Sequence, residues 1–128
     1  MLDDLHIFAS KDPSHVSLQG RQNRFTVIVR IDSLAIDDLP GVGFKPTIEQ
    51  RTTFARHNLD AIREIAENLL ERGEAHHEDR LGQPGLAVRI RDIDFAEYLL
   101  KPRSHLSLAA FDLRAQSKWA SGWQGRFA

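Results

Sequence analysis

Three arginines are the side chains of this chain whose positions best suit ligand binding. Arg89 and Arg91 alternate along one apolar segment, and Arg30 lies on the polar side of an earlier segment of the same kind. A guanidinium binds a phosphate or a carboxylate through two parallel hydrogen bonds. If the two segments pair as strands, we expect the three arginines to form one basic patch. The alternative is a solvated sheet face balanced by carboxylates, since antiparallel sheets commonly leave one face in water.

Three aromatic residues near the C-terminus form a second candidate site. Trp119, Trp123 and Phe127 are each four residues apart, so on a helix they would form one stripe. Such a stripe suits a protein interface, where aromatic residues are enriched, or single-stranded nucleic acid, whose bases stack on aromatic rings. We favour packing on the chain itself or on a second copy, because 17 basic and 18 acidic residues provide no overall attraction to phosphates.

Motifs for catalysis and metal binding are weak. His76 and His77 stand among acidic residues, but neighbours point apart in an extended chain and no second histidine pair completes a metal site. His57 and Asp60 share a helix face, but nothing near them in sequence is a nucleophile. Residues 41–43 lack the third glycine of a dinucleotide-binding loop. We therefore expect no catalytic residue, no metal and no cofactor.

Two segments have the alternation that predicts the β-strands carrying these arginines. Residues 25–31 and 86–90 place apolar side chains at every second position, and the first segment is rich in β-branched residues. Ile28 lies on the otherwise polar side of the first segment, so we expect that strand to be covered on both faces. Apolar runs at residues 5–9 and 15–18 predict two shorter strands, and residues 20–23 predict a turn.

One long helix is predicted over about residues 48–72. Thr47 and Gln50 have the spacing of a capping box, and Gly73 suits the left-handed position that follows a helix. No glycine or proline interrupts the segment, and apolar residues recur at helical spacing from Ala55 to Leu69. We expect a single rod that lies across the sheet with its charged side in water.

These elements predict an α+β fold, with a small mixed or antiparallel sheet packed on one long helix and short C-terminal helices. A length of 128 residues fits one domain, which we assign to residues 1–103. Residues 104–128 differ in composition, and we interpret them as a C-terminal extension, either a helix or an arm. Ser104 can begin a helix that carries the leucines following it.

Composition excludes several classes of protein. The chain has no cysteine, which excludes disulfides and thiolate chemistry. Its net charge is −1, and its apolar runs are too short to span a bilayer. The first residues are acidic and have no signal-peptide pattern. We expect a cytoplasmic protein with no membrane association.

The order of several motifs carries a family resemblance. They are the strand at residues 25–31, the helix opening Phe54-Ala55-Arg56-His57-Asn58, the helix end Arg72-Gly73 and the closing Arg91-Asp92-Ile93-Asp94-Phe95. Over about residues 25–95 the chain resembles a family of short bacterial proteins of unassigned function. The resemblance implies a small α+β domain with one main helix, and it transfers no catalytic residue. The chain departs from the family between residues 73 and 86 and after residue 103.

These observations favour a non-enzymatic binding or regulatory module. We expect its partner to be another protein or a second copy of the chain. The first alternative is a nucleic-acid-associated protein that uses the C-terminal tail and the arginine sheet face. The second is a small enzyme or an inhibitor encoded by a mobile element.

Overall fold

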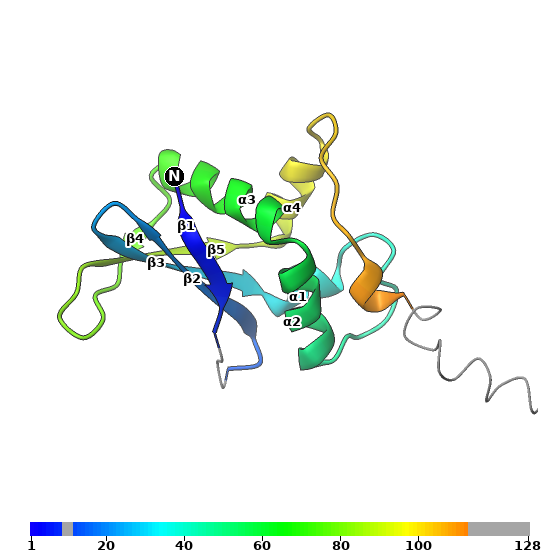
Figure 1. The fold of residues 1–128 in the computed structure, drawn as a ribbon. Helices are drawn as coiled ribbons and strands as arrows, with labels where there is room; N and C mark the ends of the chain where they lie inside the picture. The colour runs from blue at the N-terminus through cyan, green and yellow to red at the C-terminus, as the bar shows by residue number, and fades with distance from the viewer. Residues whose placement is uncertain (9–11, 113–128) are drawn as a thin grey trace, which may run out of the picture.

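The computed structural model describes residues 1–8 and 12–112 (Figure 1). Over these ranges the chain forms a five-stranded mixed sheet and four α-helices. The α+β fold class and the mixed sheet predicted from the sequence are confirmed. No helix in these ranges combines the length and the apolar character that crossing a bilayer requires.

The sheet has its two best-predicted strands side by side. The strand order is β1 (Asp3–Ile7), β2 (His15–Gln22), β3 (Phe25–Asp32), β5 (Gly85–Ile90) and β4 (His76–His77). β3 and β5 run parallel, and the long connection between them contains helices, as the crossover between parallel neighbours usually does. The other neighbouring pairs are antiparallel. The parallel register places Arg30 directly beside Arg89.

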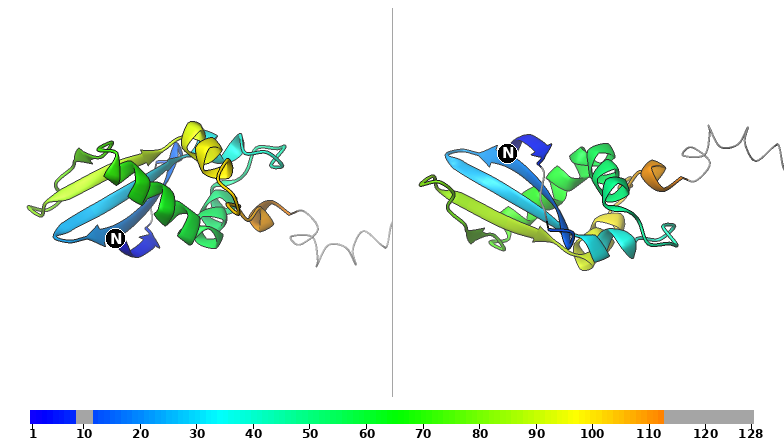
Figure 2. Two further views of the ribbon diagram at one scale, coloured as in Figure 1. Left: turned by 90° about the horizontal axis from the view of Figure 1, so that it is seen from above. Right: turned by 90° about the horizontal axis from the view of Figure 1, so that it is seen from below.

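Helices cover one face of this sheet. They are α1 (Ser33–Asp37), α2 (Ile48–His57), α3 (Leu59–Glu71) and α4 (Asp92–Leu99). Figure 2 shows α3 lying across the strands from above, and the opposite face without a helix from below. Alternate residues of β3 pack in the same core as the apolar stripe from Ile62 to Leu69. Ile28, on the face without a described helix, is also fully buried, as predicted.

The single long helix predicted over residues 48–72 is wrong, because it is two helices that meet at Asn58 (Figure 1). In a continuous helix the N–H of Asn58 would donate to the carbonyl of Phe54. Here the side-chain Nδ2 of Asn58 donates to that carbonyl (2.8 Å), and the main-chain N–H donates to the carbonyl of Ala55 (3.2 Å). The side chain thus replaces a main-chain hydrogen bond, and the chain bends there. The predicted capping box of Thr47 and Gln50 is present.

Residues 104–112 pack on the domain and do not form the helix predicted to begin at Ser104. Oδ1 of Asn58 accepts from the N–H of Ser107 (2.7 Å), and its Nδ2 donates to the Ser107 carbonyl (2.9 Å). Beyond this clamp, a 3-10 turn (Ala109–Phe111) stacks Phe111 on Phe54, with ring centroids 5.6 Å apart. The extension predicted for residues 104–128 is therefore described only as far as residue 112.

Candidate functional site

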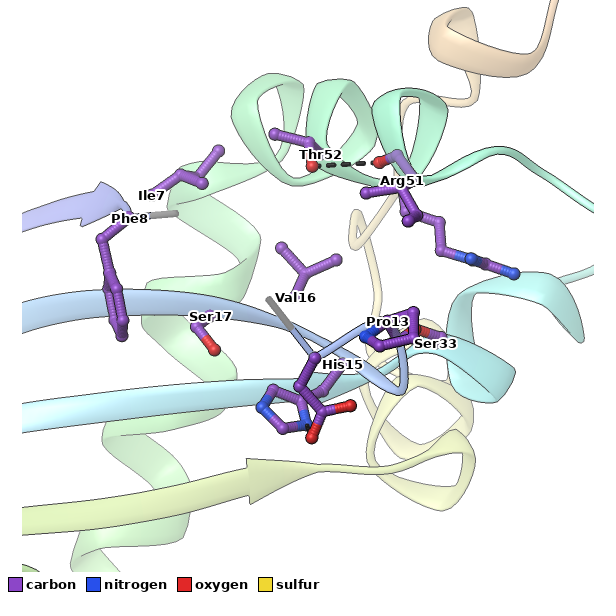
Figure 3. Close-up of a pocket in the computed structure, with 11 residues that line it drawn as sticks. Ile7, Phe8, Pro13, His15, Val16, Ser17, Ser33, Arg51 and Thr52 are labelled. Atoms are coloured by element: carbon purple, nitrogen blue, oxygen red, sulfur yellow. Dashed lines mark hydrogen bonds and ion pairs between the residues drawn. The ribbon is translucent and has the colours of Figure 1, made fainter. Parts of the chain in front are cut away.

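Two adjoining pockets lie at the end of the sheet where β3 leads into α1. The larger, here called the cationic pocket, has a volume of about 610 Å³ and is lined mainly by charged residues: Arg30, Asp32, Asp37, Lys45, Arg51 and Arg89. The smaller, called the apolar pocket, has a volume of about 300 Å³ and includes Ile7, Phe8, Val16, Ile48 and Thr52 (Figure 3). Both volumes are in the range of small-molecule sites.

Four separate elements supply the positive charges of the cationic pocket. Arg30 comes from β3 and Arg89 from β5, as cross-strand neighbours. Arg51 comes from α2, and Lys45 from the connection between α1 and α2. Residues far apart in sequence therefore converge on one hollow, which is the arrangement expected of a binding site rather than of local helix decoration.

Arg51 makes the most buried ion pair of the site. Its Nε donates to Oδ1 of Asp37 (2.8 Å) and its Nη2 donates to Oδ2 (2.7 Å). The two side chains are only 9% and 13% exposed, so water screens the pair weakly. These hydrogen bonds raise the pKa of Arg51 further above its usual value, despite its burial. The pair connects α2 to α1 and holds one wall of the pocket.

The other two arginines form ion pairs that are more exposed to water than that of Arg51. Nη1 of Arg30 donates to Oε2 of Glu78 (2.6 Å), and Nη2 donates to the second carboxylate oxygen. Nε of Arg89 donates to both oxygens of Asp32 (2.8 and 3.0 Å). Within residues 1–8 and 12–112, the two Nη atoms of Arg89 have no hydrogen-bond partner, and Lys45 has no ion pair. These two exposed side chains are therefore the groups able to receive an anion.

The ion pair of Arg30 and Glu78 predicts a pH dependence of stability. The hydrogen bond from Arg30 is the main cause that lowers the pKa of Glu78 below its usual 4.5. In acid the unfolded chain therefore takes up this proton first, so the contribution of Glu78 to stability is complete above about pH 4.5 and is lost as the pH falls through the folded pKa. We expect the free energy of unfolding, measured by denaturant titration, to fall less steeply below pH 5 in Glu78→Gln than in the wild type.

Glu71 provides the control for that prediction. It is exposed at the end of α3 and has no ion pair among the described residues. The Glu71→Gln variant should keep the wild-type pH profile. Superimposable profiles for Glu78→Gln and the wild type would show that the ion pair does not contribute to stability.

A serine, a histidine and an aspartate also meet at the rim of both pockets. The hydroxyl of Ser14 donates to Oδ1 of Asp12 (2.6 Å) and lies 3.1 Å from Nδ1 of His15. The N–H of Ser14 donates to the same carboxylate oxygen, and these hydrogen bonds lower the pKa of Asp12. Because the hydroxyl proton goes to the carboxylate and not to the imidazole, His15 does not activate Ser14 as a nucleophile. This cluster is a hydrogen-bonded turn.

The structure brings together part of the arginine patch predicted from the sequence. Arg30 and Arg89 line one pocket, whereas Arg91 lies apart at the start of α4, 3.5 Å from Asp94 and 3.9 Å from Glu74. Ligand binding by these arginines stays a prediction. The aromatic stripe of Trp119, Trp123 and Phe127 lies outside the described residues.

The weaker sequence motifs are not assembled as metal ligands or as an acid–base pair in the described part of the chain. His76 and His77 are both exposed in β4, and no three His, Asp or Glu residues of that part are grouped as metal ligands. Asp60 pairs with Arg63 (3.1 Å) and not with His57.

Sequence reasoning missed Lys45, His15 and Arg51 as site residues. For Lys45 and His15 we find no local signal, because only the fold places the loop of Lys45 and the start of β2 beside the arginines. Arg51 does have a local signal, because it lies four residues before Ala55, in line with the apolar stripe of the predicted helix. A charged residue in a buried stripe indicates a buried partner, which here is Asp37.

Comparison with known proteins adds no assignment. No family model, no curated protein sequence and no solved structure matches the chain. The resemblance to short bacterial proteins stays a prediction, and the residues of the two pockets are the basis for a functional proposal.

Proposed function

We propose that this protein is a non-enzymatic binding module for a small anionic ligand, which it receives in the cationic pocket. The observation that supports this most is the convergence of Arg30, Lys45, Arg51 and Arg89 from four elements on one hollow. Each arginine already has a carboxylate partner, so Lys45 supplies the uncompensated charge. A ligand group with a single negative charge, such as a carboxylate, matches that excess.

The paired and unpaired cations have different roles in this proposal. Arg51 and Arg30 are each held by two hydrogen bonds to a carboxylate, so they form fixed walls of the pocket. Lys45 attracts the anion as a mobile point charge, and Arg89 donates from its Nη atoms. Fixed walls lower the ordering cost of binding, because fewer side chains lose freedom when the ligand enters.

A nucleic-acid partner, the first alternative from the sequence, fits these contacts less well. Affinity for nucleic acid grows with the number of phosphates that Lys and Arg neutralise. The carboxylates paired with Arg30, Arg51 and Arg89 compensate most of the charge that such binding needs. A protein partner or a second copy also remains a proposal from the sequence, and the cationic pocket bears on neither.

Titration with acetate and with inorganic phosphate at low ionic strength, followed by NMR chemical shifts, tests the proposal. We expect Lys45→Gln and Arg89→Gln each to weaken acetate binding about tenfold, because a hydrogen bond to a charged group is worth about 1.5 kcal/mol or more. Both side chains are exposed, so neither change should disturb folding.

Matched controls lie far from the pocket. Lys101, which is near Glu64, and Arg24, in the turn between β2 and β3, are exposed cations outside it. The Lys101→Gln and Arg24→Gln variants should bind acetate like the wild type. Wild-type binding by Lys45→Gln and Arg89→Gln, or equal losses in all four variants, would contradict the proposed site.

A further inference from the structure

We infer that the ligand is amphipathic: a carboxylate whose apolar chain or ring of about six to eight carbon atoms enters the apolar pocket while its anionic group lies in the cationic pocket. This inference rests on the proposed function and names the class of ligand. It is carried by the contact between the two pockets and by the chemistry of their walls.

Three elements build the apolar pocket. Ile7 ends β1, Val16 lies in β2, and Ile48 and Thr52 lie on the first turns of α2 (Figure 3). Val16 is buried, whereas Ile48 on the wall of the hollow is 60% exposed. An apolar group in the pocket would cover Ile48 and remove that surface from water, which is favourable.

The size of the pocket limits the apolar group. Its volume is about 300 Å³. A dry cavity of about 150 Å³ holds one benzene ring. The apolar pocket therefore suits one ring with its substituents or a chain of moderate length, and it is too small for a helix of a partner protein, whose diameter with side chains is about 10–12 Å.

Arg51 lies at the boundary between the two pockets and lines both of them. The pockets share four lining residues, Pro13, His15, Ser33 and Arg51. In Figure 3 the side chain of Arg51 leaves α2 beside Thr52 and runs toward Ser33 at the start of α1, away from Ile7. Arg51 lines both pockets, and its guanidinium is held at Asp37 on the charged side. A ligand that crosses this boundary must have an apolar part directly joined to an anionic part.

A series of carboxylates tests the inference on the full chain. Acetate, butanoate, hexanoate and octanoate have the same anionic group and differ only in their apolar part. Full burial tightens binding about fourfold per methylene group, so for this partly open pocket we expect roughly twofold to threefold per carbon up to octanoate. The gain in affinity per added carbon should level off when the alkyl chain of the ligand has filled the apolar pocket.

Two variants identify where the alkyl chain of the ligand lies. Thr52→Trp fills the apolar pocket, and Ile48→Ser removes its exposed wall; both should reduce the advantage of octanoate over acetate at least fivefold while acetate binds as before. Arg56→Trp, one turn further along α2 and outside both pockets, is the control and should bind like the wild type.

The outcomes separate this inference from the proposed function. If acetate binds with dependence on Lys45 but chain length has no effect, the inference is overturned and the anion site stands. If the gain with chain length is the same in Thr52→Trp and Ile48→Ser as in the wild type, the apolar group lies elsewhere and the inference is again overturned. If no carboxylate binds, the proposed function and the inference are both overturned.

Discussion

The Asn58→Ala variant is expected to lose about 3 kcal/mol of unfolding free energy, at roughly 1 kcal/mol for each of three hydrogen bonds. Asn58 is 5% exposed, and its amide bonds the carbonyl of Phe54 and both main-chain groups of Ser107. Alanine leaves these groups without their partner in a largely buried place, which adds a desolvation cost. The segment that carries Phe111 into the core would lose its hydrogen bonds to the helices and would be held there by the packing of Phe111 on Phe54.

Intrinsic helix propensity predicts the opposite sign. In an uninterrupted helix over residues 48–72, alanine would be more stable than asparagine by about 0.5–0.7 kcal/mol. Asn68, half-buried within α3, has no side-chain hydrogen bond among the described residues and is the matched control. Denaturant titration should therefore show Asn68→Ala to be neutral or slightly stabilised and Asn58→Ala to be strongly destabilised. An Asn58→Ala variant as stable as Asn68→Ala would mean that the clamp does not contribute to stability.

The break at Asn58 shows what a count of apolar periodicity leaves out. The apolar positions from Ala55 to Leu69 correctly predicted which helix face is buried, because burial repeats with the local helical period. Arg51 and Asn58 lie on the same buried face, and both are polar. A buried polar side chain needs a partner, but the partners, Asp37 and Ser107, are distant in sequence. The sequence shows which polar residues lie on the buried face, but it does not show which residues they bind.

For the strands too, the local sequence predicts the element but not its neighbours in the sheet. Alternation predicted β3 and β5, but their adjacency depends on pairing across an intervening crossover. The turn predicted at residues 20–23 is shifted, since β2 continues to Gln22 and the turn follows at Asn23. Gly20 belongs to the strand, where it pairs with Val27, and a Cβ at this position would lie only 2.9 Å from a methyl group of Leu2. That close approach comes from the pairing of β1 with β2 and has no local sequence signal.

Of the three arginines predicted to form one patch, Arg30 and Arg89 lie side by side and Arg91 does not join them. Arg30 and Arg89 share a face because parallel neighbours in register point the same way. Arg91 follows the end of β5 at Ile90, and α4 begins at Asp92, so the alternation that placed Arg91 with Arg89 no longer applies. The N–H of Arg91 instead donates to the carboxylate of Asp94 (2.7 Å) at the start of α4. Whether a polar side chain joins a site thus depends on where its element ends.

The Arg51→Met variant should cost about 3–5 kcal/mol of unfolding free energy, because it leaves the carboxylate of Asp37 buried without its partner. Replacing both residues, as in Arg51→Met with Asp37→Leu, should recover most of this loss, since an apolar pair of similar volume is often as stable as a buried ion pair. Arg63→Met is the control: it removes an exposed pair with Asp60 and should change stability by less than about 1 kcal/mol.

The double variant also separates the two roles assigned to Arg51. If it regains stability but binds acetate several-fold more weakly than the wild type, the guanidinium contributes to the anion site beyond holding α2 against α1. If it regains both stability and acetate binding, Arg51 only shapes the wall, and Lys45 and Arg89 bind the anion. If the double variant is as unstable as Arg51→Met alone, the unpaired carboxylate is not the cause of the loss, and the arginine must stabilise the fold through the packing of its methylene groups between the two pockets.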